Sequence, residues 1–154
     1  MKQEKLIVRV LIVEDDEERV SVFKRMLKHA KKLPHDCEIR LVWAKNAGAA
    51  IGLLERDPGN VYAGIMLDHD LDRQNLTSWD GLFTGKDVVK KIINVVDKDT
   101  LMFVHSTNVT GGPKMRTTLE GAGFYTKLHP WGTIRLNMFR DWLLEVCEVV
   151  QGNA

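Results

Sequence analysis

The sequence predicts an α/β protein built on a doubly wound parallel sheet of five strands. Five short apolar runs, rich in Val, Ile, Leu or Met and bounded by polar residues, are typical of strands buried on both faces. Segments with helical spacing of apolar residues follow these runs, and such alternation favours parallel strands joined by right-handed crossovers. The 154 residues suffice for one sizeable core, so we expect a single domain over residues 1–154.

The first half of the chain is expected to contain three strands and two helices. The strands are predicted at residues 6–13, 37–43 and 61–67. A helix at 17–32 has apolar side chains at helical spacing and ends before Pro34, because proline disfavours helical geometry in the residue before it. Asn46 can cap the second helix, which runs to about Arg56. Four basic side chains of the first helix are expected to point outward: Arg19, Lys24, Lys28 and Lys31.

The second half begins with a long segment, residues 68–83, that has no periodicity. Long irregular loops in compact domains are usually functional or disordered. Further elements are then predicted in the order helix from about 84, strand 100–106, helix 114–120, strand 123–128 and helix 133–150. Together these elements indicate a flavodoxin-like fold of three α/β/α layers with strand order 2-1-3-4-5.

Polar side chains follow three of the predicted strands where each strand ends. They are Glu14, Asp15 and Asp16 after the first strand, Asp68, His69 and Asp70 after the third, and His105, Ser106 and Asn108 after the fourth. The carboxyl ends of parallel strands meet at one edge of a sheet, where ligands bind. We therefore expect Glu14, Asp15 and Asp68 to lie around one crevice.

The acidic residues of this edge favour a divalent metal, Mg²⁺ or Mn²⁺. Converging carboxylates repel one another unless a cation lies between them, and oxygen ligands suit these ions. An acidic run also suits the start of a helix, so the acidic residues after the first strand could be explained without a metal. The second acidic group, after the third strand, favours a metal site. The predicted ligands are Glu14, Asp15, Asp16, Asp68 and Asp70. Either Glu14 with Asp15 or Asp15 with Asp16 could face the metal, and Asp70 could instead orient His69 or cap the loop.

At these positions the chain resembles the receiver domains of two-component signalling, over nearly its whole length. LIVEDD resembles the acidic metal-binding turn, and Asp68 matches the aspartate that accepts a phosphoryl group. Ser106 matches the switch hydroxyl and Lys127 the lysine that pairs with phosphate. The resemblance implies a CheY-like fold in which Asp68 attacks phosphorus and the phosphate is held by Ser106 and Lys127. Thr107 and Asn108 are further candidates, because backbone N–H groups of the turn before the next helix could bind phosphate, with a plain loop as the alternative.

Several strings depart from an ordinary signalling receiver. DHDL places a histidine and a second acid after Asp68, HSTN replaces a hydrophobic-Thr-Ala pattern, and Lys127 is followed by LHP. With an Arg soon after DDE, a loop ending near TGKDVV and the string HSTNVTGG, these features resemble the cyclic-phosphate-processing receiver family. That family is proposed to act on cyclic phosphate ends of RNA. The resemblance implies a metal-dependent phosphoesterase or phosphotransfer domain.

Two histidines fit this chemistry. Opening a 2′,3′-cyclic phosphate needs a nucleophile on phosphorus and an acid for the departing ribose oxygen, and histidine titrates near neutral pH. His69 and His105 are candidates for these proton transfers, beside Asp68 as nucleophile or metal ligand. His129 is more typical of a structural residue. The competing hypotheses are a stand-alone receiver phosphorylated on Asp68 by a histidine kinase, and a module that holds phosphate without turnover.

Composition and net charge limit the kinds of partner and the cellular location that we expect. A net charge of +1 gives no basic field of the kind that drives nonspecific nucleic-acid binding. No apolar stretch approaches a membrane span, and the first residues lack a signal-peptide core, so we expect no membrane partner and a cytoplasmic location. Cys37 and Cys147 are expected to be buried free thiols.

Overall fold

One five-stranded parallel sheet forms the centre of the molecule, with strand order β2-β1-β3-β4-β5 as predicted. The computed structural model describes residues 4–56, 61–68, 71 and 83–152. The strands are β1 Leu6–Val13, β2 Cys37–Ala44, β3 Tyr62–Leu67, β4 Leu101–His105 and β5 Thr126–His129. This order places β1 between β2 and β3, so the switch point of the sheet lies between β1 and β3.

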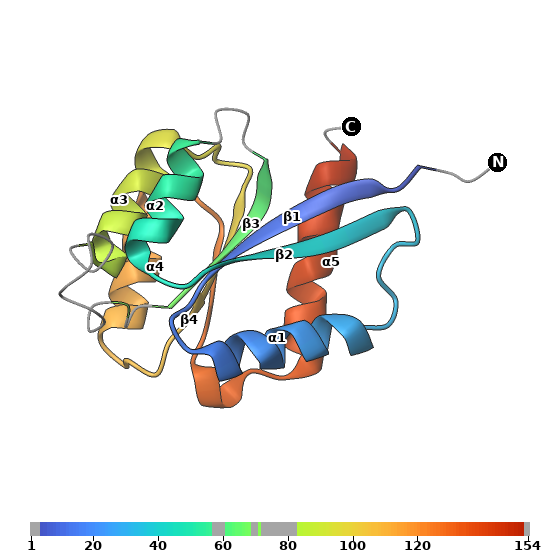
Figure 1. Ribbon diagram of the computed structural model, residues 1–154, viewed down its shortest axis with the longest axis horizontal. Coiled ribbons are helices and arrows are strands. Elements are labelled where there is room, and N and C mark those ends of the chain that lie inside the picture. The colour runs from blue at the N-terminus through green and yellow to red at the C-terminus, as the bar shows by residue number, and fades with distance from the viewer. Residues whose placement is uncertain (1–3, 57–60, 69–70, 72–82, 153–154) are drawn as a thin grey trace.

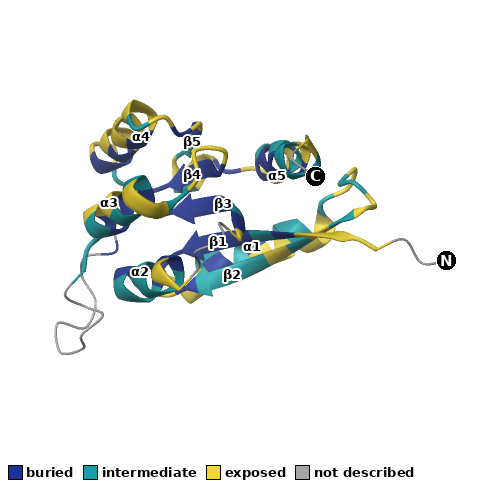
Figure 2. Cartoon of the chain, turned by 90° about the horizontal axis from the view of Figure 1, so that it is seen from above, coloured by how far each residue is buried: buried dark blue, intermediate teal, exposed yellow. Residues whose placement is uncertain are grey.

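Helices cover both faces of the sheet, which confirms the three-layer prediction (Figures 1 and 2). The helices are α1 Glu17–His29, α2 Ala47–Glu55, α3 Gly85–Val95, α4 Gly111–Gly121 and α5 Leu136–Gly152, with a short 3₁₀ helix at Trp131–Thr133. Helices α1 and α5 pack on one face, and α2, α3 and α4 pack on the other. No helix among the described residues is long and apolar enough to span a bilayer.

The alternation of side chains along each strand builds a separate core on each face. In β1, Val10 and Ile12 pack with residues of α1 and α5, whereas Leu11 and Val13 pack with residues of α2, α3 and α4. All four of these side chains are fully buried. The prediction that strands are buried on both faces is therefore confirmed for β3, β4 and most of β1, whereas β2 at the edge of the sheet is only half-buried.

Several element boundaries differ from the predicted ones. Helix α1 ends at His29, because Ala30 already has an extended backbone and Lys32 adopts a positive φ of 70° in the turn toward β2. Strand β5 begins at Thr126, since Gly123 at φ 100° is still part of the turn that follows α4. Helix α4 begins three residues before the prediction, and α5 begins after a 3₁₀ turn. Asn46 caps α2 as predicted, by accepting a hydrogen bond from Ala49 N at 2.7 Å.

We expect Gly64→Ala to destabilise the protein by about 1–3 kcal/mol, because the new methyl group would overpack a rigid core site. A Cβ on Gly64 in β3 would lie 2.7 Å from Cη2 of Trp142 and 3.3 Å from Cγ2 of Val146. The Trp142 ring is buried against Phe103 and cannot turn away. Urea unfolding measures the change. Gly121→Ala is the control, since nothing lies within 4 Å of its Cβ, and equal effects at both positions would contradict this explanation.

Candidate active site

The residues that follow β1 and β3 lie in one row with the last residue of β4. The register partners just before this row are Val13, Leu67 and Val104. The next position along each chain is therefore Glu14, Asp68 and His105, at the carboxyl edge and on the side of α1 and α5. Strand β5 adds His129, the register partner of His105. Acid and base groups from four strands thus share one line across the sheet, as predicted for the first three of them.

Glu14 and His105 form a fully buried hydrogen-bonded pair. Oε2 of Glu14 lies 2.8 Å from Nε2 of His105, and neither side chain is exposed to solvent. Burial raises the pKa of Glu14 from 4.5 to about 7 and lowers the pKa of His105 from 6.5 to about 4. Between these two pKa values Glu14 holds the shared proton and donates it in a hydrogen bond to the neutral ring. His105 therefore reaches the crevice only through Glu14, and its position does not support the predicted direct contact with substrate.

The surroundings of the His105 ring explain why it stays neutral. The Phe23 ring of α1 packs edge-on against it with centroids 5.1 Å apart, and Phe103 lies 6.3 Å away. Within the described part of the chain, Nδ1 of His105 has no hydrogen-bond partner. A charged ring would bury a positive charge among these aromatic side chains, away from water, so burial favours the neutral form.

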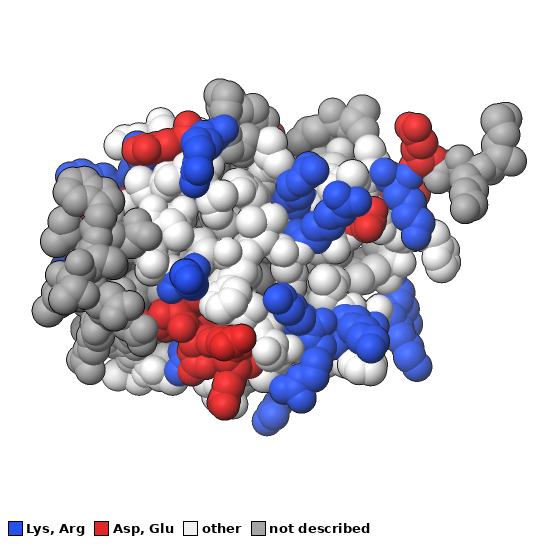
Figure 3. Space-filling view, in the orientation of Figure 1, with Lys and Arg blue, Asp and Glu red and all other residues white. Residues whose placement is uncertain are grey.

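Three carboxylates form the acidic cluster of the site. Glu14, Asp15 and Asp68 each offer an oxygen atom, and these atoms all lie within 4.8 Å of one another. Asp16 has a different role: its side chain caps α1 by accepting a hydrogen bond from Glu18 N at 2.9 Å. The structure therefore favours Glu14 with Asp15 as the metal-facing pair. Figure 3 shows acidic side chains gathered over the beginning of α1 and basic side chains along the rest of that helix.

Arg19 covers this cluster, so the prediction that it points outward is wrong. Its Nη1 lies 3.5 Å from Oδ2 of Asp68 and 3.9 Å from Oε1 of Glu14. The guanidinium also lies over the ring of Trp131, 5.1 Å from the ring centroid. Position 19 is in the first turn of α1, directly after the acidic turn, and this location brings the side chain back over the sheet edge.

The hydroxyl loop after β4 is held together by its own hydrogen bonds. Ser106 is buried, and its Oγ accepts a hydrogen bond from Asn108 N at 3.0 Å. Oδ1 of Asn108 accepts hydrogen bonds from Thr110 N and Gly111 N at 3.0 and 2.6 Å. These backbone groups are satisfied within the protein, so the structure favours a capping role for Asn108 over the predicted phosphate contact. Thr107 is exposed beside them.

The structure does not bring Lys127 to the cluster. Lys127 pairs with Phe103 in the sheet, two residues before the row at the edge, and its Nζ lies 5.4 Å from the centroid of the Tyr125 ring. The edge position of β5 is occupied by His129, whose pKa is lowered by burial and by the charge of Lys127. Arg19 and His129 are thus the residues that sequence reasoning missed at this edge. The predicted site residues His69 and Asp70 lie outside the described residues.

The residues present fit a divalent cation. Three converging carboxylate oxygens are the donor set that Mg²⁺ or Mn²⁺ takes in proteins. The raised pKa of Glu14 shows that its charge is incompletely compensated, even with the Arg19 guanidinium within 4 Å. A cation at this place would favour the ionised form of all three carboxylates.

Solved structures of similar fold include response-regulator receiver domains. The Mn²⁺-bound form of response regulator Rcp1 aligns with a TM-score of 0.58 and 16% identity, over 90% of this chain and 91% of that chain. A signal receiver domain of an HD domain-containing protein from Pseudomonas fluorescens Pf-5 gives 0.64 and 12%, over 99% and 94%. The receiver domain of Ssk1, in complex with the Saccharomyces cerevisiae phosphotransfer protein Ypd1, gives 0.55 and 15%, over 90% and 86%. These likenesses show a receiver fold.

Sequence comparison identifies the family more closely. No curated protein matches the sequence at a significant level. The family described as the cyclic-phosphate processing receiver domain matches residues 10–121, which is more than half of the chain and contains Glu14, Asp68 and His105. The chain therefore belongs to the cyclic-phosphate processing receiver domain family.

Proposed function

We propose that this protein is a metal-dependent phosphoesterase or phosphotransfer domain that acts on cyclic phosphates, with 2′,3′-cyclic phosphate ends of RNA as its substrate class. The observation that carries the proposal is the buried pair of Glu14 and His105 in the same row as Asp68. A phosphorylation switch needs an acceptor carboxylate and cations around the phosphoryl group. It has no use for a buried histidine that shares a proton with a neighbouring carboxyl group, whereas ester cleavage does need controlled proton transfer.

The metal would be held by Glu14, Asp15 and Asp68, together with Asp70 as the sequence predicts. When bound, a divalent cation would neutralise charge on the phosphate oxygens and make phosphorus more open to attack. His105 acts as a positioning residue, because its ring fixes one carboxylate oxygen of Glu14 while the other oxygen faces the cluster.

The reaction is the addition of water across one phosphorus–oxygen bond of the ring. A bond forms between phosphorus and the attacking oxygen, the bond from phosphorus to one ribose oxygen breaks, and that ribose oxygen takes up a proton. Asp68 is the candidate nucleophile because its carboxylate lies in the row at the crevice. In that case water releases the phosphoryl group from Asp68 in a second step. His69 remains the predicted acid for the ribose oxygen.

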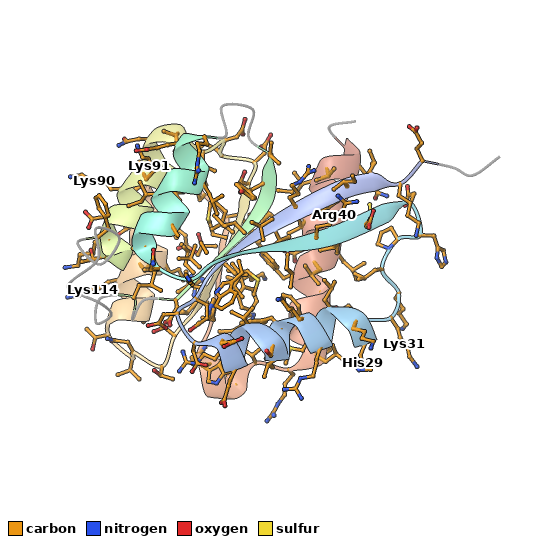
Figure 4. All side chains as sticks on the ribbon, in the orientation of Figure 1. His29, Lys31, Arg40, Lys90, Lys91 and Lys114 are labelled. Carbon is orange, nitrogen blue, oxygen red and sulfur yellow. The ribbon has the colours of Figure 1, made fainter. Side chains whose placement is uncertain are left out.

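A basic groove between α3 and α4 supports an RNA end as the substrate. The cavity has a volume of about 460 Å³, and it reaches the first turns of both helices, at the carboxyl edge of the sheet. Its lining includes Lys86, Lys90 and Lys114 over an apolar floor. Figure 4 shows Lys90 and Lys114 on the outer side of these helices. Among the described residues these three lysines have no ion pair, whereas Lys91 pairs with Glu55 at 2.9 Å. A groove with free positive charge suits the backbone of a single strand.

The proposal is tested by ³¹P NMR of 2′,3′-cyclic AMP incubated with the protein and Mg²⁺ or Mn²⁺. The expected result is loss of the cyclic phosphate signal and growth of one monoester signal, whose chemical shift shows which ester bond opens. The same sample with a chelator should show no change. Absence of turnover with either metal, for both the nucleotide and the oligonucleotide described next, would contradict the proposal.

An RNA oligonucleotide that ends in a 2′,3′-cyclic phosphate tests the substrate class. It should be processed with a lower KM than the nucleotide, and a combined Lys90→Ala and Lys114→Ala variant should remove most of that advantage while leaving the nucleotide rate unchanged. The matched control replaces Lys24 and Lys28 on α1, which removes equal charge at exposed positions outside the groove. A KM advantage that survives both double variants would place the RNA strand elsewhere.

The receiver fold favours a second candidate function, phosphorylation of Asp68 by a histidine kinase or phosphotransfer protein. The solved complex of a receiver domain of similar fold with a phosphotransfer protein supports this candidate. It predicts a stable acyl phosphate on Asp68 after treatment with a small phosphodonor such as acetyl phosphate, detected by mass spectrometry. Phosphorylation without turnover of cyclic phosphate would favour this second function.

A further inference from the structure

We infer that Arg19 is the cation that binds the phosphate oxygens at this site. The inference rests on the proposed phosphorus chemistry, and it holds whether the phosphate belongs to a substrate or is carried by Asp68. Among the described residues, Arg19 is the basic side chain in contact with Asp68, at 3.5 Å. Lys127, which was predicted for this role, lies two residues below the edge and has its Nζ over the Tyr125 ring.

The Arg19 side chain is held from two sides. Carboxylates lie below it, with Nη1 in contact with Asp68 and Glu14 and with Nε 3.9 Å from Oδ2 of Asp16. The ring of Trp131 lies against the guanidinium at 5.1 Å. The Arg19 side chain is only 20% exposed, and stacking on an aromatic ring leaves the N–H groups at its rim free to donate in the plane of the guanidinium. This arrangement keeps a planar two-point donor above the candidate nucleophile.

A divalent cation and the guanidinium compete for the same carboxylates. A cation held by Glu14 and Asp68 would repel Arg19 and would compete with it for these carboxylates. The contact with Trp131 and the position in the first turn of α1 would keep the displaced guanidinium next to these carboxylates. Its donors are then available to the oxygens of a phosphate group, which arginine binds with two parallel hydrogen bonds.

This competition predicts effects of opposite sign for Arg19→Gln. Calorimetric titration with Mg²⁺ alone should show tighter binding than in the wild type, because the competing charge is gone. Titration with inorganic phosphate at saturating Mg²⁺ should show binding weakened by about 10- to 100-fold, the loss expected for a charge-assisted hydrogen bond. Arg19→Lys keeps the charge without the planar fork and should give intermediate phosphate affinity.

Two variants serve as matched controls. Arg25→Gln removes an exposed arginine from the same helix, and Lys127→Gln removes the lysine that the sequence predicted for this role. Both should leave the phosphate and Mg²⁺ affinities unchanged. Thermal unfolding of each variant confirms that it is folded before the titrations are compared.

Trp131 provides a readout that does not depend on turnover. Binding of phosphate to the guanidinium that lies over this ring should change tryptophan fluorescence when phosphate is added in the presence of Mg²⁺. The change should disappear in Trp131→Phe and in Arg19→Gln, and it should persist in Arg25→Gln. A purely structural role of Arg19 in α1 would not couple this signal to phosphate.

The outcomes separate this inference from the proposed function. Unchanged phosphate affinity in Arg19→Gln would make Arg19 a mere counter-ion and overturn the inference, as would a wild-type protein that binds no phosphate. Turnover of cyclic phosphate together with phosphate binding that ignores Arg19 would overturn the inference alone. Arg19-dependent phosphate binding without turnover would support the inference and overturn the proposed function.

Discussion

Replacing Asp68 by asparagine is expected to reduce turnover of 2′,3′-cyclic AMP by about 1,000-fold or more, the scale seen when a nucleophile or its essential partner is removed. Asparagine keeps the shape of the side chain but can neither attack phosphorus nor carry the charge that a divalent cation needs. Asp68 is buried, with 1% of its surface exposed, so solvent cannot supply a substitute oxygen in the same place. Initial rates from ³¹P NMR measure the effect.

The folded state should survive this substitution. Asparagine keeps the size of the side chain, so the variant should remain folded, whereas the stabilisation by added Mg²⁺ should shrink because one of the three carboxylates is lost. Asp16→Asn is the matched control, because Asp16 caps α1 and asparagine caps a helix equally well. Loss of turnover in Asp16→Asn with full activity in Asp68→Asn would show that the metal-facing residues are wrongly assigned.

The pattern of apolar residues predicted the fold because the central strands β3 and β4, and most of β1, are buried on both faces. The run from Leu6 to Val13 is apolar except for Arg9, as expected for a strand between two helix layers. The helix ends were less predictable. Helix α1 stops at His29 because the chain must turn to begin β2 at Cys37, and this turn depends on where β2 pairs with β1. Such constraints come from the assembled sheet and leave no local signal.

The sequence predicted which residues lie at the strand ends, but not which of these residues contact one another. Glu14, Asp68 and His105 each follow an apolar run, and parallel strands bring such residues to one edge. The contact of His105 with Glu14 joins residues 91 positions apart, so it depends on the order and register of the strands. Lys127 was placed at the edge by resemblance, but the register of β5 gives that position to His129. The return of Arg19 over the crevice likewise depends on how α1 leaves the sheet.

The role of Asn108 also could not be chosen from the sequence. Its side chain accepts two backbone hydrogen bonds within three residues, whereas the sequence left a phosphate-binding turn and a plain loop as the alternatives. The role of this turn depends on which backbone N–H groups the fold leaves free. In the structure, the N–H groups of Thr110 and Gly111 already donate to the Asn108 side chain.

The second large effect concerns the dependence of stability on pH in metal-free protein. The pKa of Glu14 is raised from 4.5 to about 7 by burial, so its contribution to stability is complete below pH 4.5 and is lost as the pH rises through 7. The pKa of His105 is lowered from 6.5 to about 4 by burial, so its contribution is present above pH 6.5 and is lost as the pH falls through 4. Each difference corresponds to about 3 kcal/mol. Between pH 4.5 and 6.5 the two contributions oppose each other and nearly cancel.

Replacing either residue should therefore make the free energy of unfolding depend on pH. The two replacements should give slopes of opposite sign. His105→Gln leaves the carboxyl group of Glu14, so the free energy of unfolding of this variant should fall by about 3 kcal/mol as the pH rises from 4.5 to 7. Glu14→Gln leaves the buried imidazole, so this variant should lose a similar amount as the pH falls from 6.5 to 4. Urea unfolding with a chelator present, at half-unit steps of pH, measures both curves. Parallel curves for the two variants would mean that the buried pair does not share a proton, because opposite slopes arise only if Glu14 is protonated and His105 is neutral in the folded protein.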